Sequence, residues 1–292
     1  MAIPTPVILD ISEWQTPATI NYDKMAKALD GVIVRIQYGS NYVDKHYKTH
    51  IAEFQKRGIP VAVYAWVRGS SLSDMEKEAT DFYNRAKAYN PTFWWLDVEE
   101  KSMNDMRTGV EKYRAKLKAL GAKKVGAYIA NHLYAGFNLD TAKFDGIWIP
   151  TYGANNGQYN GSNPTATSNY DIHQYTSNGK LNGYSGPLDL NRIVKKGFDF
   201  FFGNTGGASS VAKEEYYTTP GWYTFLKDDT LYTSTSFGKN KVSGIKVGKG
   251  TRFYADEVVT NPSGTAYRGV ILKFGKSGKR YFTLNKKYVT KG

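Results

Sequence analysis

The chain has 292 residues, 41% of them hydrophobic, no cysteine and a formal net charge of +13. This composition is typical of one large or two ordinary globular domains and excludes a chain that is disordered throughout. The lack of cysteine excludes disulfides and thiolate ligands, and the four histidines have no metal-ligand spacing, so we expect neither a catalytic metal nor a cofactor. Apolar stretches stay shorter than the ~18 residues that cross a bilayer, so we expect no membrane insertion.

Strand-like and helix-like segments alternate in the first part of the chain. The predicted strands are residues 7–9, 32–36, 61–65, 93–98, 125–129, 147–150 and 170–175. The predicted helices are residues 44–57, 73–89 and 104–120, and the second opens with Ser73 and Glu76 at the spacing of a capping box. Alternation at intervals of roughly 25–35 residues is typical of a parallel β/α barrel or an open sheet.

The alternation stops at residues 152–169, which are rich in Gly, Asn, Ser and Thr and have no helical apolar stripe. The last strands are therefore predicted to be joined by loops. We expect an α/β fold, an irregular TIM-like (β/α) barrel with about eight strands and fewer helices, which lie mainly on its first part.

A small, polar segment at residues 204–213 is predicted to be a linker between two domains, residues 1–203 and 214–292. Beyond it, short aromatic and β-branched runs divided by turn residues predict a small all-β barrel or sandwich. Residues 211–292 hold 15 Lys/Arg and 6 Asp/Glu, a net charge of +9, against +4 for the rest. The charge favours an anionic partner, and nucleic acid, a membrane surface and an anionic cell-wall polymer fit it equally well.

One pair of acids stands out in the predicted barrel. The apolar run 93–98 predicts a buried strand, and Asp97 and Glu99 lie on one face of it because side chains alternate along a strand. Two residues along a strand span about 6.6 Å. Acids this close at the end of a buried strand tend to have their pKa values pushed apart, which glycosidic bond cleavage requires. The alternative is a pair of solvated acids at a strand exit, which is common.

Other strand ends supply further candidates, since the catalytic groups of a β/α barrel lie at the C-terminal ends of several strands. Asp10 follows the first strand, and Asp189 lies just beyond the seventh. Amides can bond sugar hydroxyls and aromatic rings can stack on sugars, although core packing is the alternative for many of the rings. The candidates for substrate binding are Gln37, Tyr64, Trp66, Tyr128, Trp148, Tyr152 and Gln174.

Several segments of the barrel region occur in the order typical of one known family. They are Val7-Ile8-Leu9-Asp10-Ile11-Ser12-x-Trp14-Gln15, Gly31-Val32-Ile33-Val34-Arg35-Ile36, Gly58-Ile59-Pro60-Val61-Ala62-Val63-Tyr64, Leu96-Asp97-Val98-Glu99, Gln174-Tyr175-Thr176 and Leu188-Asp189-Leu190-Asn191. Over roughly residues 5–200 they resemble glycoside hydrolase family 25, the muramidase-type lysozymes. This resemblance implies an incomplete barrel with fewer than eight helices, in agreement with the loop-joined strands.

The resemblance also implies roles for the four acids. Glu99 takes the position of the proton donor, and Asp97 that of the residue which steers the N-acetyl group of the substrate. Asp10 and Asp189 complete the acidic cluster. The implied reaction is hydrolysis of the β-1,4 bond between N-acetylmuramic acid and N-acetylglucosamine in peptidoglycan.

Two departures from the family pattern affect the substrate-binding walls. His173 stands where a tryptophan often precedes the Gln-Tyr pair, and Ala65-Trp66 replaces a common His-Phe. We interpret His173 as a structural histidine rather than a substrate ligand.

The basic tail resembles bacterial SH3-like cell-wall-binding domains. Gly221-Trp222-Tyr223-Thr224-Phe225 is similar to their opening strand. The resemblance implies that the tail binds a wall peptide or an anionic wall polymer, and its lysines suit the carboxylates and phosphates of such walls. Nucleic acid is the weaker alternative, because no nucleic-acid-binding motif is present.

Two rival functions remain at this stage. A chitinase of family 18 would need the pattern Asp-x-x-Asp-x-Asp-x-Glu, but Thr92 and Trp95 stand at its first two acidic positions. A non-catalytic wall-binding protein on a degenerate barrel is the second rival, and the presence of all four acids argues against it.

The opening Met-Ala-Ile-Pro-Thr-Pro has neither a basic region nor an apolar core, so no secretory signal is predicted. In this respect the sequence resembles bacteriophage endolysins, which implies synthesis in the host cytoplasm and action at the bacterial wall after release. A cell-encoded autolysin exported by another route is the alternative. We expect a monomer.

Overall fold

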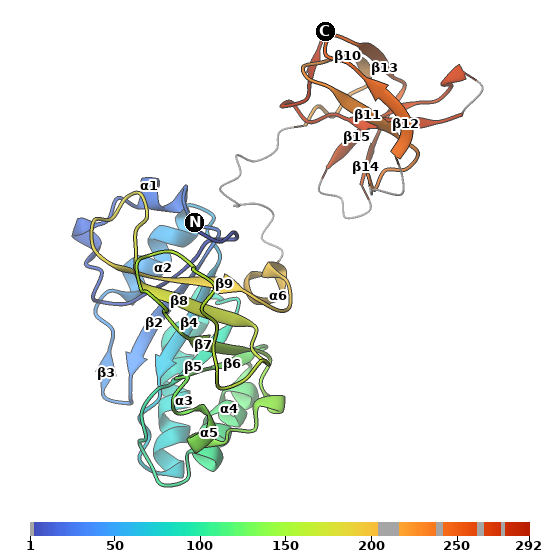
Figure 1. Cartoon of the computed structure of the whole chain (residues 1–292). Helices are drawn as coiled ribbons and strands as arrows, with labels where there is room; N and C mark the ends of the chain where they lie inside the picture. The colour runs from blue at the N-terminus through green and yellow to red at the C-terminus, as the bar shows by residue number, and fades with distance from the viewer. Residues whose placement is uncertain (1–2, 204–215, 238–241, 262–265, 276–277) are drawn as a thin grey trace. The chain divides into compact units, whose positions relative to one another are not determined.

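The computed structural model describes residues 3–203, 216–237, 242–261, 266–275 and 278–292 (Figure 1). The chain divides into two compact units, residues 1–210 and 211–292. The predicted linker at residues 204–213 lies outside the described residues.

The first unit is a closed barrel. Its sheet has the strand order β1-β9-β8-β7-β6-β5-β4-β2-β3, and an additional β1–β2 pairing closes the ring and leaves β3 outside it. The ring strands are β1 (Ile8–Ile11), β2 (Gly31–Tyr38), β4 (Val61–Trp66), β5 (Trp94–Val98), β6 (Val125–Ile129), β7 (Ile147–Pro150), β8 (Ile172–Gly179) and β9 (Leu188–Ile193); β3 spans Tyr42–Val43. This confirms the predicted irregular barrel of eight strands.

The last strand runs against the others. β9 pairs antiparallel with both β8 and β1, whereas the other ring neighbours are parallel. Only residues 180–187 separate β8 from β9. A parallel crossover needs a dozen or more residues, so this short connection turns the chain straight back. Asp189 therefore stands at the beginning of its strand, where it pairs with Asp10 of β1.

Helices cover mainly the first part of the barrel, as predicted (Figure 1). The helices are α1 (Tyr22–Ala26), α2 (Tyr47–Lys56), α3 (Leu72–Ala86), α4 (Met106–Leu120), α5 (Tyr134–Phe137) and α6 (Phe198–Phe202), with short 3-10 turns η1 (Pro17–Thr19), η2 (Lys87–Tyr89) and η3 (Thr141–Lys143). The predicted capping residue Ser73 is wrong, because the Ser71 side chain instead accepts from the Asp74 N–H. α4 ends as predicted at Gly121, which adopts φ 113°, a left-handed conformation that favours glycine.

Two apolar layers stabilise the barrel. One lies between the strands and the surrounding helices, and the other fills the interior. α6 closes the interior at the end where the strands begin, since Phe201 stacks 5.8 Å from Trp95. A Cβ atom at Gly31 would lie 2.8 Å from the ring of Phe202, so only glycine leaves room for this helix. Apolar side chains therefore fill the interior between α6 and the C-terminal ends of the parallel strands.

The second unit is all β, as predicted. Its strands are β10 (Gly221–Phe225), β11 (Asp229–Tyr232), β12 (Val242–Val247), β13 (Arg252–Ala255), β14 (Glu257–Thr260), β15 (Tyr267–Ile271), β16 (Arg280–Thr283) and β17 (Val289–Lys291). They form a three-stranded sheet, β13-β10-β17, and a five-stranded sheet, β12-β11-β16-β15-β14. Tyr223 and Phe282 lie in its buried core, while Trp222 and Tyr254 are 50% and 45% exposed.

Candidate active site

The four predicted acids line one cavity at the C-terminal end of the parallel strands. Asp10 lies on β1, Asp97 on β5 and Asp189 on β9, and Glu99 is the first residue after β5. The cavity has a volume of about 160 Å³. Its lining residues are Asp10, Ser12, Trp14, Arg35, Tyr64, Trp66, Asp97, Glu99, Tyr128, Trp148, Tyr152, Gln174 and Asp189.

Hydrogen bonds fix the orientation of Asp10. Its Oδ2 accepts from Gln174 Nε2 at 3.0 Å and from Asn191 Nδ2 at 2.7 Å. The amide oxygen of Gln174 accepts in turn from the hydroxyls of Tyr128 at 3.0 Å and Tyr152 at 2.8 Å. Because two tyrosine hydroxyls donate to this oxygen, the Gln174 amide presents its N–H groups, not its oxygen, to Asp10.

Burial makes the central carboxyls hard to ionise. It raises the pKa of Glu99 to about 7, and the charges of Asp189 and Glu100 add to the shift while Arg35 opposes it. Burial raises the pKa of Asp97 well above its ordinary value, with Glu99 adding to the effect. Asp97 Oδ1 is buried and has no hydrogen-bond partner among the described residues. Glu99 can therefore hold a proton near neutral pH, as a general acid must.

Burial also raises the pKa values of the other two acids. Burial raises the pKa of Asp189 to about 6. Burial and the charge of Asp189 also raise the pKa of Asp10, but the amide donors of Asn191 and Gln174 oppose this rise. Amide donors stabilise the charged form of a carboxyl group, so they limit how far burial raises the pKa of Asp10.

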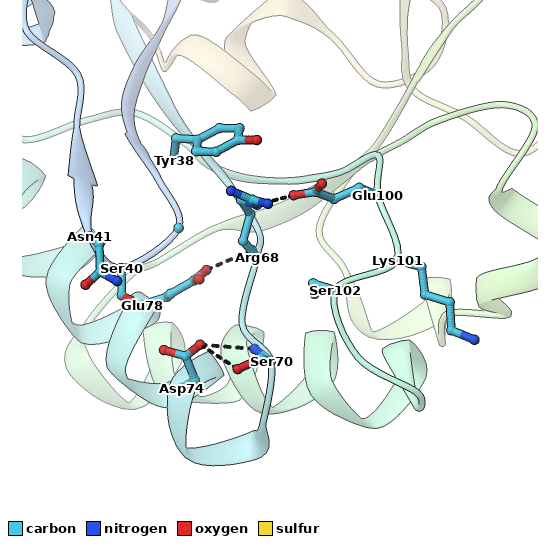
Figure 2. A pocket seen from close by; sticks show the side chains of 11 residues that line it. Tyr38, Ser40, Asn41, Arg68, Ser70, Asp74, Glu78, Glu100, Lys101 and Ser102 are labelled. Atoms are coloured by element: carbon cyan, nitrogen blue, oxygen red, sulfur yellow. Dashed lines mark hydrogen bonds and ion pairs between the residues drawn. The ribbon is translucent and has the colours of Figure 1, made fainter.

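Most of the predicted substrate-binding residues line the cavity, namely Tyr64, Trp66, Tyr128, Trp148, Tyr152 and Gln174. Tyr128 and Trp148 are only 6% and 2% exposed, so they form its floor. Trp66 stands at the edge, where its Nε1 donates to Glu100 Oε1 at 3.2 Å. Glu100 belongs to a neighbouring polar cavity (Figure 2).

The prediction for Gln37 is wrong. Its side chain is fully buried, donates to the Glu78 carbonyl at 3.0 Å and accepts from Arg85. The cause is a register shift in the β2–β4 pairing, where Arg35 faces Tyr64 but Gln37 faces Ala65. An extra residue reverses which side of the barrel the following side chains point to.

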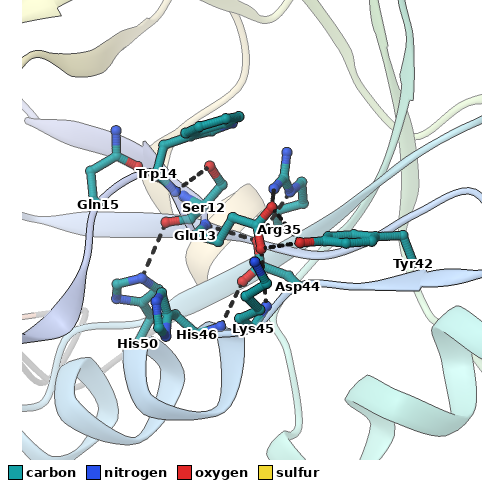
Figure 3. Close-up of polar contacts among 10 residues, drawn as sticks. All are labelled: Ser12, Glu13, Trp14, Gln15, Arg35, Tyr42, Asp44, Lys45, His46 and His50. Carbon is teal, nitrogen blue, oxygen red and sulfur yellow. Dashed lines mark hydrogen bonds and ion pairs between the residues drawn. The ribbon is translucent and has the colours of Figure 1, made fainter.

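Arg35 takes the inward position instead, and sequence reasoning missed it. Its Nε bonds Asp44 Oδ2 at 3.0 Å and its Nη2 lies 3.1 Å from Glu13 Oε1 (Figure 3). A lone arginine in the apolar run 32–36 is the signal that could have identified it, because a buried charge needs partners. Its positive charge lowers the pKa values of Asp97 and Glu99 and so limits how far burial raises them.

Trp14 is a second cavity residue that was not predicted. It is 77% exposed at the rim, on a loop held by the Glu13 N–H bond to Asp44 at 2.9 Å and by Tyr42, whose hydroxyl donates to Glu13 at 2.7 Å (Figure 3). A large exposed ring on a fixed loop is suited to stacking on a sugar.

His173 has a structural position. It is fully buried, and its Nε2 donates to the Thr151 carbonyl at 2.8 Å while Nδ1 accepts from Arg192 at 3.1 Å. Burial lowers its pKa to about 4, so it is neutral near pH 7. Neither nitrogen is available to a substrate.

Comparison with known proteins identifies the family. The family model described as glycosyl hydrolases family 25 matches residues 9–184, more than half of the chain. The chain belongs to this family. Within it, the glycosyl hydrolase 25 GHIP of Streptococcus pneumoniae, described as a virulence factor participating in host cell invasion, is 45% identical, with a TM-score of 0.66 over 68% of this chain and 93% of that one.

Three further relatives are an endolysin and two lysozymes. The catalytic domain of endolysin ply40 from bacteriophage P40 of Listeria monocytogenes is 27% identical, with a TM-score of 0.62 over 71% of this chain and 98% of that one. The autolytic lysozyme of Clostridium acetobutylicum is 26% identical over 189 residues, which are 63% of this chain and 55% of that protein. Lysozyme M1 of Streptomyces globisporus is matched over 66% of its length. The chain thus spans less than two thirds of these two lysozymes.

Proposed function

We propose that this family 25 glycosidase hydrolyses peptidoglycan, at the β-1,4 bond between N-acetylmuramic acid and N-acetylglucosamine. The observation that supports this most strongly is the cavity with four carboxyl groups, in which Glu99 has a pKa of about 7. Aromatic side chains and amides around the acids suit an N-acetylated sugar. The related lysozymes of Clostridium acetobutylicum and Streptomyces globisporus support the choice of substrate.

The proposed reaction begins with proton transfer from Glu99 to the glycosidic oxygen. The buried Oδ1 of Asp97, which lacks a partner among the described residues, is suited to bond the N–H of the substrate's acetamido group. The acetamido oxygen then assists departure of the leaving sugar, and water completes the hydrolysis. Direct attack of water with inversion is the competing course.

The all-β unit is proposed to be an SH3-like domain that holds the enzyme on the wall. Its sheet β13-β10-β17 presents Trp222 and Tyr254 as direct cross-strand neighbours, with ring centroids 5.5 Å apart. The Arg252 guanidinium lies 5.3 Å from the Trp222 ring centroid. Exposed aromatic rings beside a guanidinium suit a wall polymer that has sugar rings and carboxylates.

In its biological setting the protein is proposed to be a bacteriophage endolysin that is made in the host cytoplasm and reaches the wall after release. Its similarity to the catalytic domain of endolysin ply40 supports this proposal. The similarity to an autolytic lysozyme leaves a cell-encoded autolysin as the second candidate.

Mass spectrometry of the fragments released from defined peptidoglycan tests the proposed activity. We expect disaccharide-containing fragments whose new reducing ends are N-acetylmuramic acid. New N-acetylglucosamine reducing ends or free stem peptides would contradict the proposal. Release of chitin oligomers in a parallel digest would favour the chitinase, and wall binding without new reducing ends would favour a non-catalytic protein.

A further inference from the structure

A second polar cavity (Figure 2) lies at the same end of the barrel as the active-site cavity, after strands β2, β4 and β5. It has a volume of about 400 Å³ and is built by the turn after β2, the loop between β4 and α3, and the residues that follow β5. Trp66 joins the two cavities, because it lines the first, donates to Glu100 of the second and lies 4.8 Å from the Tyr38 ring. A polymer bound in the first cavity would therefore meet the second cavity next to Trp66.

The carboxylates of this second cavity already have hydrogen-bond or ion-pair partners within the protein. Asp74 Oδ2 accepts from the Ser70 N–H at 3.0 Å, and Glu78 Oε2 accepts from the Arg68 N–H at 3.1 Å. Glu100 forms an ion pair with the Arg68 side chain in addition to its bond from Trp66 (Figure 2). These acids therefore fix the loop between β4 and α3 and the segment that follows β5.

The cationic side chains of the cavity, Arg68 and Lys101, in contrast have N–H groups without a hydrogen-bond acceptor in the described part of the chain. The Arg68 guanidinium rests 4.6 Å from the Tyr38 ring centroid, and its Nε faces Glu100. Its two terminal nitrogens have no partner in the described part of the chain, and its side chain is 47% exposed. Lys101 is exposed at the same cavity and likewise has no partner there. Tyr38 and Glu100 thus hold the guanidinium in place, and the edge formed by its two terminal nitrogens remains available to a ligand.

This arrangement indicates an anionic ligand with hydrogen-bonding groups. A planar guanidinium recognises a carboxylate, and Ser40, Asn41 and Ser70 can bond amide groups. Lys101 lines the same cavity, with its side chain extending away from Arg68 (Figure 2). A neutral sugar would need no cation.

We propose that the second cavity binds the stem peptide of the peptidoglycan strand under hydrolysis, through a peptide carboxylate on Arg68, with Lys101 adding positive charge at the edge of the cavity. This rests on the proposed function and adds a determinant of substrate choice to it. The enzyme thereby favours glycan strands that still bear peptides over bare strands.

The test measures kcat/KM of the full-length chain on soluble glycan strands with stem peptides and on the same strands after an amidase has removed them. The ratio of the two values reports peptide recognition. Arg68→Lys, which keeps the charge beside Glu100 but loses the planar fork, and Lys101→Ala each lower this ratio about tenfold, mainly through KM. Lys56→Ala, an exposed lysine of α2 outside the cavity, is the matched control and keeps the wild-type ratio.

A wild-type ratio near one, or unchanged ratios in both cavity variants, would overturn the proposal. Competition by poly(glycerol phosphate) but not by a free stem tripeptide would also overturn it, because the cavity would then be a phosphate-polymer site. If wild-type enzyme cut neither strand, the proposed function would fail instead. Binding of the free tripeptide to the wild-type chain, measured by calorimetry and lost in Arg68→Lys, would still support the cavity assignment.

Discussion

At the scale of single residues, the proposed reaction depends most on Glu99. Glu99→Gln keeps the size of the side chain and removes the proton, so hydrolysis of purified walls should fall about 10²–10⁴-fold. Turbidity loss and reducing-end formation measure the effect. Glu76→Gln on α3, outside the cavity, is the control and should lyse walls like the wild type. Normal lysis by Glu99→Gln would remove Glu99 from the role of acid.

The pH dependence tests the electrostatic environment of the same residue. Glu99 acts while protonated, so activity is present below its pKa of about 7 and is lost as the pH rises through that value. The charge of Asp189 raises this pKa, so Asp189→Asn lowers it and moves the alkaline limb of the kcat/KM profile to lower pH.

The exposed Asp23, 78% accessible at its side chain, supplies the control for this profile. Asp23→Asn removes the same charge far from the cavity and should leave the limb where it is. A limb that stays in place or moves to higher pH in Asp189→Asn would contradict the proposed coupling.

At the scale of elements, α6 contributes more to the barrel than its five residues suggest. Phe201 is fully buried against Trp95 and Phe93, so Phe201→Ala leaves a cavity and should cost about 3–5 kcal/mol of unfolding free energy. Urea unfolding followed by tryptophan fluorescence measures it. Phe200→Ala, at a partly exposed position of the same helix, should cost less than half as much; equal losses would show that α6 does not close the interior.

The sequence predicts these elements unevenly. The strands of the ring are predicted well from 7 to 175, because buried parallel strands are short apolar runs that stand out from amphipathic helices. β9 is missed as a strand, since its alternation includes Asp189, Asn191 and Arg192 and its pairing is decided by the length of the preceding turn. The side to which Gln37 points depends on a bulge that no local pattern in β2 announces.

The site residues, too, were predicted where local sequence marks them and missed where contacts between distant segments decide. Asp10, Asp97 and Glu99 were found because they lie at the ends of recognisable strands, whereas Asp189 stands at the beginning of the strand that was missed. Arg35, Asn191 and Trp14 were missed as site residues because their roles come from contacts between distant segments, such as Asn191 with Asp10 across a separation of 181 residues. Such contacts are properties of the closed ring rather than of any one strand.

At the scale of the whole molecule, the uneven charge makes wall binding separable from hydrolysis. Trp222→Ala, made in the Glu99→Gln chain so that walls stay intact, should weaken sedimentation with purified walls about tenfold. Leu226→Ala, 42% exposed on the same unit, is the control and should bind like its parent. Binding should also weaken with added salt, which screens the +9 charge of residues 211–292. Equal sedimentation of both variants would exclude Trp222 from the wall contact.

The reversed direction of β9 has a consequence for how this enzyme can be re-engineered. An eighth parallel strand would leave the chain at the end with the acids, whereas β9 leads it to the opposite end, where α6 ends at Phe202. A foreign module joined after Gly203 would thus start from the sealed end of the barrel. The point of attachment is therefore separate from the residues that line the catalytic cavity, and a library of fusions can vary the attached module without redesigning that cavity.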